Sequence, residues 1–487
     1  MVRRVSYFGN HKNARCAVID REQELRFLME RAGGSQAELV VMWGRRRLGK
    51  TTLLKALCEA HPAIYFLATQ APAQEQLRRL STAFADFFRD PLLERTTLPS
   101  WEDAFSYLAR NARSRTILAV DEFPYLVEAD HSVPSRFQFG WDEHLAKNPN
   151  LMLILNGSSL AMMEQHVLGS KSPLYGRRTG QWRIEPFSLL QFWKFFPHRP
   201  LTDIVEAYTV VGGVPFYALQ FDPAASLAQN VTRRILSKGA VLYEEVPFLL
   251  REEVREPRSY FPILAAISAG SRKFGEISSK TGFDKANLGK YLATLQELRL
   301  IRREVPITEP DPGKSRKGLY AIEDPFTDFW LRYVWPNLAA LEMDHGKEVW
   351  ERHIAPDFPN YVARRCERIV SDLLRQPAIR QWLGFEAAVI GKYWDPKTEL
   401  DIVALDRDGR QAAIGEVKWT KRPVGSDAAR KLRAQADNVE ALRSFSKRFL
   451  LFSRAGFTEN LRACTQDDMC LVDLNGARLP CPHLFAK

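Results

Sequence analysis

The stretch Trp43-Gly44-Arg45-Arg46-Arg47-Leu48-Gly49-Lys50-Thr51-Thr52 decides the fold of the N-terminal part of this 487-residue chain. It follows an apolar run at residues 39–42 and leads into an amphipathic segment. After it, residues 63–67 have the pattern of a buried strand and residues 73–88 that of a helix. The pattern Gly-x-x-x-x-Gly-Lys-Thr between a strand and a helix is typical of a phosphate-binding loop, because its glycines let backbone N–H groups converge on an anion. We predict that residues 44–52 bind the phosphates of ATP, that Lys50 reaches the β- and γ-phosphates, and that Thr51 ligates Mg²⁺.

An acidic pair after a later apolar run completes the prediction of a nucleotide-hydrolysing site. The run at residues 116–120 is followed by Asp121 and Glu122. A P-loop ATPase requires acids at the tip of such a strand, because one holds Mg²⁺ and the next orients and polarises the attacking water. We predict that Asp121 holds the metal through water and that Glu122 is the catalytic carboxylate.

A third apolar run, at residues 151–155, ends in Asn156-Gly157-Ser158-Ser159. A polar side chain at this place can hydrogen-bond the γ-phosphate or the attacking water, as sensor 1 does in P-loop ATPases. Asn156 or Ser158 fits that role, and the sequence does not decide between them. A helix cap by Ser158 or Ser159 accounts for the same residues equally well.

Two arginines and a helical segment follow the predicted catalytic strands. Arg177 or Arg178 is placed to neutralise transition-state charge, within the chain or across a subunit boundary, and a solvated basic turn is the alternative. Residues 186–250 have a helical pattern that is interrupted by Gly212-Gly213-Val214-Pro215. We predict a small helical lid for this segment.

Residues 251–340 have the pattern of a winged helix-turn-helix followed by an aromatic connector. Three short helical segments precede a strand near residue 300 and a polar loop at 310–318, and residues 285–295 would form the recognition helix. Between Tyr260 and Glu304, eight arginines and lysines outnumber four acids, an excess that suits contacts with DNA phosphates. The alternative is a winged helix that packs against protein. The aromatic residues at 326–335 are more typical of packing between domains than of base stacking.

The C-terminal part carries a second chemical signal, in two strands at residues 399–405 and 411–419. Asp408-Gly409 between them favours a two-residue hairpin turn. This register places Asp401 opposite Glu416 and Glu399 opposite Lys418, with facing Cβ atoms about 4.5–5.5 Å apart. Facing carboxylates need a cation between them or a proton on one of them.

This pairing predicts a site of the D…(E)xK nuclease type. Asp401 and Glu416 would hold a divalent metal that activates water, and Lys418 would orient the water or stabilise the developing charge. A solvated, salt-bridged strand is the alternative. Glu367, on a helix at residues 361–374, is a further acidic candidate, and Gln435 is a weaker one.

Composition limits the other classes of function. The net charge of +11 and the isoelectric point near 9.3 favour a polyanionic partner. No apolar run approaches the roughly 18 residues of a membrane helix, and residues 1–7 precede no hydrophobic stretch, so a membrane anchor and a secretory signal are not expected. The six scattered cysteines show no zinc-binding spacing and favour a reduced, cytoplasmic protein.

With these motifs assembled, the chain resembles the archaeal-type ATPase family of the AAA+/STAND group. The resemblance covers nearly the whole chain and rests on these segments: GRRRLGKTTLL, LAVDEFPYL, LNGSS, SPLYGRRTG, GGVPFY, KFGEISSKTG…LGKYLATLQELRLI, DPFTDFWLRYV and ELDIVAL…GEVKW. Members of this family carry a P-loop domain, a winged helix and a C-terminal nuclease-like domain. The resemblance does not indicate a substrate.

The resemblance also implies roles for single residues. It implies that residues 20–22 border the adenine pocket, that Ser158 is the sensor, and that Arg177 or Arg178 is the arginine finger. It implies a restriction-endonuclease-like, PD-(D/E)XK fold for the C-terminal part, with Asp401, Glu416 and Lys418 at its motif positions.

We therefore predict an α/β multidomain protein. Its parts would be a three-layer α/β/α P-loop ATPase domain at residues 1–185, a helical lid at 186–250, a winged helix-turn-helix with the aromatic connector at 251–340, and a nuclease-like α/β domain at 341–487. The predicted cofactors are ATP and Mg²⁺, with a second divalent metal in the C-terminal domain.

The leading functional hypothesis is an ATPase that couples hydrolysis to the winged-helix and nuclease-like parts, acting on DNA. A metal-dependent nuclease regulated by ATP is the second hypothesis, and a slow nucleotide-switched regulatory protein is the third. The predicted partner is DNA. The alternatives are another nucleic acid, a protein partner or a second copy of the chain.

Overall fold

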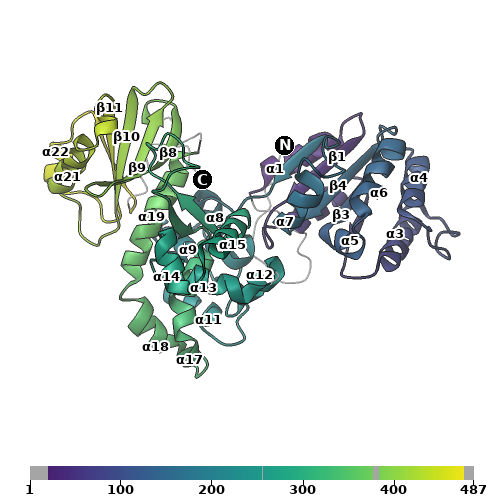
Figure 1. Cartoon of the computed structure of the whole chain (residues 1–487), viewed down its shortest axis with the longest axis horizontal. Helices are drawn as coiled ribbons and strands as arrows, with labels where there is room; N and C mark the ends of the chain where they lie inside the picture. Colours follow the sequence, from purple (N-terminus) through teal and green to yellow (C-terminus); the bar gives the residue numbers. More distant parts are fainter. Residues whose placement is uncertain (1–19, 255, 377–382, 476–487) are drawn as a thin grey trace. The chain divides into compact units, whose positions relative to one another are not determined.

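The computed structural model describes residues 20–254, 256–376 and 383–475 (Figure 1). Residues 1–7, for which no secretory signal is expected, lie outside these ranges, as do Cys16 and Cys481. The chain forms two compact units, residues 1–185 and 186–487. Within the described ranges, no helix has the length and apolar character needed to cross a membrane.

A parallel five-stranded sheet forms the centre of the first unit, with the strand order β2-β3-β4-β1-β5. Every residue of β3 and β4 is buried, as expected for apolar strands covered on both faces. The predicted strand at residues 63–67 and the three other predicted apolar strands are confirmed. The strands are β1 (Glu38–Trp43), β2 (Ala63–Leu67), β3 (Thr116–Asp121), β4 (Leu151–Gly157) and β5 (Gly180–Arg183).

Helices connect and cover these strands, and the longest of them, α3, has the bounds that its apolar periodicity predicts. One large apolar core joins β1, β2, β3 and β4 to α3 and α4. The helices are α1 (Glu22–Ala32), α2 (Lys50–Ala60), α3 (Ala73–Phe88), α4 (Trp101–Asn111), α5 (Pro124–Ala129), α6 (Val133–Gly140) and α7 (Leu160–Met163), with π-helical turns at Trp141–Leu145 and Glu164–Leu168.

The second unit begins with short helices. The predicted break at residues 212–215 is confirmed, because α9 ends at Val211 and the next helix begins at Pro215. These helices are α8 (Leu189–Trp193), α9 (Leu201–Val211), α10 (Pro215–Ala218), α11 (Leu227–Arg234) and α12 (Glu245–Glu253).

Three helices and an antiparallel strand pair follow. The helices are α13 (Pro257–Ser268), α14 (Phe274–Thr281) and α15 (Lys285–Glu297), and the strands are β6 (Ile301–Glu304) and β7 (Leu319–Ile322). Asp284 caps α15 by accepting hydrogen bonds from the N–H groups of Ala286 and Asn287. The buried residues of α15 are Leu288, Leu292 and Leu295, which leaves its other face toward solvent.

The aromatic connector, for which the sequence predicted packing between domains rather than base stacking, packs inside this second unit. Phe326, Phe329, Trp330 and Tyr333 are buried, and the Trp330 indole donates a hydrogen bond to the carbonyl of Tyr243 at 2.7 Å. The elements are α16 (Pro325–Phe329), α17 (Leu338–Leu341), α18 (Gly346–Val349) and α19 (Phe358–Leu374), with π-helical turns at Trp330–Val334 and Trp350–Ile354 and a 3₁₀ turn at Trp335–Asn337.

A mixed five-stranded sheet, ordered β12-β11-β10-β9-β8, completes the unit. Phe449 and Leu451 of β11 belong to the apolar core under α21, whereas Phe452 lies beside apolar residues of α19. Successive side chains of a strand alternate between faces, so α19 and α21 cover opposite faces of this sheet. The elements are β8 (Ala387–Trp394), β9 (Glu399–Asp406), β10 (Gln411–Lys418), α21 (Ser426–Asp437), a 3₁₀ turn (Glu440–Leu442), β11 (Ser446–Ser453), α22 (Glu459–Ala463) and β12 (Met469–Asp473).

Candidate functional site

Two glycines shape the loop between β1 and α2. Gly49 adopts φ +86° just before α2, in the left-handed region that L side chains rarely enter. Gly44 approaches Ile184 so closely that a Cβ on Gly44 would lie 2.4 Å from the Ile184 carbonyl oxygen. A side chain would clash at Gly44 and would strain the backbone at Gly49, so the two glycines let the loop turn tightly at the start of α2, where anions bind.

Lys50 is the first residue of α2, and its side chain is buried in this loop. Its ammonium group donates hydrogen bonds to the carbonyl oxygens of Gly44 and Arg45, at 2.8 and 2.9 Å. A phosphate oxygen is a charged acceptor and therefore a stronger partner for an ammonium group than a carbonyl. The side chain thus lies inside the loop that the sequence assigns to phosphate binding.

The carboxylate of Asp121 is completely buried and accepts hydrogen bonds from uncharged donors. The hydroxyls of Thr51 and Tyr65 donate to its Oδ2 at 2.8 and 2.7 Å, and the Asn156 amide donates to its Oδ1. Burial and the adjacent Asp121 raise the pKa of Tyr65 well above its usual value, so the phenol stays protonated and remains a donor.

These oxygen atoms suit the Mg²⁺ that the sequence predicts. Mg²⁺ prefers oxygen ligands and usually keeps several waters. Thr51 and Asp121 meet at one point, and the Oδ1 of Asn156 is buried without a hydrogen-bond partner in the described part of the chain. Thr51 would ligate the ion, and Asp121 would hold it through water.

Ser158, the second candidate for sensor 1, follows the end of β4 and donates two hydrogen bonds to Glu122. The Ser158 hydroxyl donates to Oε2 of Glu122 at 2.7 Å, and the Ser158 N–H donates to the same oxygen at 3.3 Å. Glu122 has φ +57°, an uncommon and costly conformation for a residue with a side chain. The structure therefore pairs Asn156 with Asp121 and Ser158 with Glu122, where the sequence left the two candidates open.

Sequence reasoning missed Tyr65 as a member of this site. The sequence showed it only as one residue of an apolar strand. Its position follows from sheet order, because β2 pairs with β3 in a register that sets Leu67 beside Asp121. The one polar group in an otherwise apolar strand, the Tyr65 hydroxyl two positions before the strand ends, was the available signal.

Arg21 connects the start of the first unit to the loop. Its guanidinium is buried and donates to the Glu24 carboxylate at 2.8 Å, to the Glu185 carbonyl at 2.7 Å and to the Leu48 carbonyl at 3.4 Å. Arg21, in the predicted segment at residues 20–22, therefore lies against the phosphate-binding loop. Their predicted place beside the adenine stays a prediction.

The two arginine-finger candidates have partners within their own unit. Arg177 forms an ion pair with Asp142, with Nε at 2.9 Å from both carboxylate oxygens. Arg178 donates to Gln181 at 2.6 Å and to the Leu168 carbonyl at 3.2 Å. Both side chains would have to leave these partners to reach a nucleotide, and their predicted role stays a prediction.

In the C-terminal sheet, the predicted hairpin register is confirmed. Ile402 pairs with Gly415 and Leu405 pairs with Ala412 between β9 and β10. The connection is longer than a two-residue turn, because the strands end at Asp406 and Gln411, where the Arg410 N–H bonds the Asp406 side chain.

Asp401 lies among several charged groups on this sheet. Burial raises the pKa of its carboxyl to about 7, and the nearby charges of Glu367 and Glu416 add to the effect, against the attraction of Lys392. Glu367 forms an ion pair with Lys392, and Glu416 forms one with Lys418. The structure thus brings together the predicted Asp401, Glu416 and Lys418 and the candidate Glu367.

Carboxylate oxygens in this cluster suit a divalent metal in charge and type, and the buried Oε2 of Glu416 has no hydrogen-bond partner among the described residues. However, in the part of the chain that the structure covers, no group of three or more His, Cys, Asp or Glu side chains is arranged to hold a metal ion. A metal here would have to displace Lys418 from Glu416. The weaker candidate, Gln435, donates to the backbone carbonyl of Glu399 at 3.3 Å.

Most basic residues of the predicted winged helix have acidic or carbonyl partners. Arg272 and Arg302 both pair with Glu304, and Lys317 pairs with Glu309. Of the described cations at residues 260–304 and in the loop at 310–318, four are exposed and form no ion pair: Lys280, Lys285, Lys290 and Arg316. The structure therefore reduces the predicted basic surface to α14, α15 and the loop between β6 and β7.

A parallel sheet with a glycine-shaped loop before α2, a buried lysine in that loop and an acidic pair at the end of β3 defines the class of P-loop ATPases. Comparison with known proteins agrees with this class. Residues 18–221 match a family described as an ATPase domain predominantly from Archaea, and residues 330–432 match one described as archaeal and bacterial proteins of unknown function.

Known relatives extend the comparison over most of the chain. An uncharacterized protein of Methanocaldococcus jannaschii is 35% identical over 403 residues, which are 82% of this chain and 87% of the relative. A Walker-type ATPase of Pyrococcus abyssi is 23% identical with a TM-score of 0.50, over 66% of this chain and 98% of that one. The second comparison shows the fold alone.

The chain belongs to the archaeal-type P-loop ATPase family, with a C-terminal domain of the second type. The predicted family, the α/β multidomain fold class and the assignment as an ATP hydrolase are confirmed.

Proposed function

We propose that this ATPase couples its nucleotide state to DNA binding through α14, α15 and the loop between β6 and β7. The observation that carries the proposal is the group of four exposed cations without ion pairs on these elements. Cations already paired with acids gain little from phosphate, whereas solvated ones release counterions from DNA. The proposal includes the predicted domain limits at residues 186–250, 251–340 and 341–487 and a reducing, cytoplasmic location.

In the hydrolytic step, Lys50 would exchange its loop carbonyls for phosphate oxygens. Bound Mg²⁺ would neutralise charge on the β- and γ-phosphates. Glu122 would orient the attacking water, and the two hydrogen bonds from Ser158 would fix the position of its carboxylate. The side chain of Arg177 or Arg178 would be recruited only after it leaves its partner in the first unit.

The test is the steady-state ATPase rate of the full chain with and without duplex DNA. We expect hydrolysis to vanish in Lys50→Ala and to fall sharply in Glu122→Gln while ATP binding survives. A Lys285→Gln/Lys290→Gln variant should keep the basal rate and lose the response to DNA.

Matched control lysines are Lys147 and Lys347, which are also exposed but pair with Glu143 and Glu351. Their double replacement by glutamine should leave DNA binding intact. In the test variant, the slope of log affinity against log salt should decrease by about 2, because two phosphate contacts are lost. An ATPase rate that DNA never changes, together with equal salt slopes for both double variants, would refute the coupling to DNA.

A metal-dependent nuclease regulated by ATP is the second candidate function, favoured by the convergence of Asp401, Glu367 and Glu416. Plasmid and single-stranded DNA would be incubated with Mg²⁺ or Mn²⁺, with and without ATP. Cleavage that is absent, or equal in Asp401→Ala, would remove this candidate. Single-turnover hydrolysis much slower than nucleotide-dependent binding would instead support a nucleotide-switched regulatory protein.

A further inference from the structure

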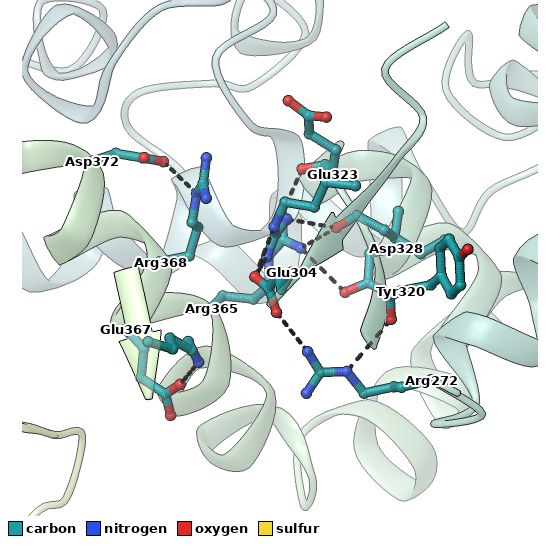
Figure 2. A network of polar contacts seen from close by, with 12 residues as sticks. Arg272, Glu304, Tyr320, Glu323, Asp328, Arg365, Glu367, Arg368 and Asp372 are labelled. Atoms are coloured by element: carbon teal, nitrogen blue, oxygen red, sulfur yellow. Dashed lines mark hydrogen bonds and ion pairs between the residues drawn. The ribbon is translucent and has the colours of Figure 1, made fainter. Parts of the chain in front are cut away.

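A cavity rich in arginine lies within the second unit. Its volume is about 410 Å³, and its walls come from α13, β6, β7, α16, α19 and β8. Seven of the residues that line it are arginine or lysine, and four are aspartate or glutamate. Two of the cations, Arg332 and Arg368, pair with Asp357 and Asp372 outside the lining, which leaves an excess of one positive charge. Figure 2 shows the polar network on its walls. We call it the arginine cavity.

Glu304 is the central acid of this cavity and serves two arginines at once. Arg272 lies 2.6 Å from one of its oxygens (Figure 2). Arg302 lies 2.8 Å from the other. Burial opposes the charge of Glu304, but Arg302, Lys392 and Arg272 outweigh burial and lower its pKa to about 2. One carboxylate therefore faces two arginines, whereas Lys392 has Glu367 as its own partner.

Helix α19 adds three arginines to the same wall. Arg364 and Arg368 are four residues apart and Arg365 lies between them, an arrangement in which like charges repel along a helix face. Arg365 is held mainly by the carbonyls of Ile322 and Glu323, at 3.2 and 3.3 Å, with the Asp328 carboxylate only at 3.5 Å.

The cations on opposite walls also act on one another. Burial lowers the pKa of Arg302, and the positive charges of Arg368 and Arg365 lower it further, against the attraction of Glu304. Repulsion between buried cations is costly unless an anion offsets it. Arg364 is exposed at this cavity and forms no ion pair with any described residue.

We propose that the arginine cavity binds a phosphate-bearing ligand, with Arg364, Arg365 and Arg368 as contacts to its phosphoryl oxygens. Guanidinium groups bind phosphate through paired N–H donors. The volume lies in the range of pockets that hold ligands larger than a single phosphate. The phosphoryl group belongs either to a small phosphorylated compound or to the end of a nucleic-acid strand.

The experiment measures binding of two probes to the full chain by titration calorimetry. The P-loop is first saturated with a non-hydrolysable ATP analogue and Mg²⁺, so that it does not take up the probes. One probe is inorganic pyrophosphate, and the other is a short single-stranded oligonucleotide with a 5′-phosphate, compared with the same oligonucleotide ending in a 5′-hydroxyl.

The test variant is Arg364→Gln/Arg368→Gln. Arg368 donates to the Asp372 carboxylate, which also accepts a hydrogen bond from Arg375 at 2.5 Å. The variant should fold, because Asp372 keeps Arg375 as a partner when Arg368 is replaced. The matched control is Arg430→Gln, an exposed arginine paired with Asp427. We expect the test variant to bind about 10- to 100-fold more weakly, as charge-assisted hydrogen bonds require, and the control to bind like the wild type. An Arg365→Lys variant, which keeps the charge but loses the fork of donors, should also weaken binding.

Each outcome decides the proposal. Pyrophosphate binding that the test variant weakens supports a small phosphorylated ligand. A requirement for the 5′-phosphate with no pyrophosphate binding supports a nucleic-acid end. No heat of binding for either probe up to about 10 mM, or equal affinity in wild type and test variant, would overturn the proposal. Because pyrophosphate binding involves no DNA, this result is independent of the proposed coupling of ATP hydrolysis to DNA.

Discussion

Replacement of Asp401 by asparagine should stabilise the C-terminal sheet, although it removes a predicted metal ligand. The carboxyl of Asp401 has a pKa of about 7 in the folded chain, raised by burial and by Glu367 and Glu416, against an ordinary value of 3.8. Ionised Asp401 therefore costs stability in the folded state. The two pKa values limit this cost to about 4 kcal/mol, and local relaxation reduces it further.

The sign of the pH dependence follows from the raised pKa. Between pH 4 and pH 7 the folded state retains a proton that the unfolded state has released, so wild-type stability falls as the pH rises through this window. Above pH 7 the full cost is present. Asparagine carries no proton to lose, so the advantage of Asp401→Asn should grow from pH 4 to pH 7 and then level off.

Hydrogen exchange of the β9 and β10 amides measures this effect locally, which avoids assuming that the whole chain unfolds in one step. At pH 8 the variant should show an opening free energy higher by about 1 to 4 kcal/mol. Glu399→Gln, on the same strand but exposed, is the control and should change little. Equal protection of wild type and Asp401→Asn at pH 8, or wild-type protection that increases with pH after correction for intrinsic exchange, would refute the reasoning.

Three further outcomes concern the ATP site. Ser158→Ala removes the hydroxyl that holds Glu122 and should lower kcat about 10-fold or more with ATP affinity nearly unchanged; an unaltered kcat would separate this contact from catalysis. Tyr65→Phe removes one donor from a buried carboxylate and should cost about 1 to 3 kcal/mol in thermal or urea unfolding of the first unit, a cost that unchanged unfolding would contradict. Arg177→Ala breaks an exposed ion pair with Asp142 that is worth about 0 to 1 kcal/mol. A loss of kcat by about 1,000-fold in this variant, but not in Asp142→Ala, would identify Arg177 as the arginine finger. Equal small effects of the two variants on kcat would reject that role.

Local patterns predicted the elements of the ATP site and the register of the C-terminal hairpin. Both depend on residues that lie close in sequence: a loop with fixed glycine spacing, acids at the tip of an apolar strand, and alternation about one turn. The strand at residues 63–67 and the helix at 73–88 have the predicted bounds. The contact between Tyr65 and Asp121 was not predictable in this way, because it depends on which strands are neighbours in the sheet.

The basic residues of the predicted winged helix show a different limit. The charge count included Arg272 and Arg302 among the cations that could contact DNA, whereas both form ion pairs with Glu304 in the structure. Part of this was open to sequence reasoning, since Arg302 and Glu304 are two residues apart on one strand and therefore share a face. The arginine cavity could not be predicted from the sequence, because its walls combine segments separated by tens of residues along the chain.

The two carboxylate centres differ in the way their charge is compensated, and this difference bears on how each would take up a metal. Asp121 is surrounded by hydroxyl and amide donors, so a hydrated Mg²⁺ would meet no competing cation among these three partners. Around Asp401, a proton and two lysines already compensate the negative charge of the carboxylates. The proton is on Asp401, Lys392 pairs with Glu367, and Lys418 pairs with Glu416. A metal there must displace the proton and compete with ammonium groups. Its apparent affinity should therefore rise steeply as the pH passes 7. Titration of the full chain with Mn²⁺ at pH 6 and pH 8, in wild type and Asp401→Asn, separates the two centres, and a wild-type affinity at the C-terminal site that is equal at both pH values would exclude this form of compensation.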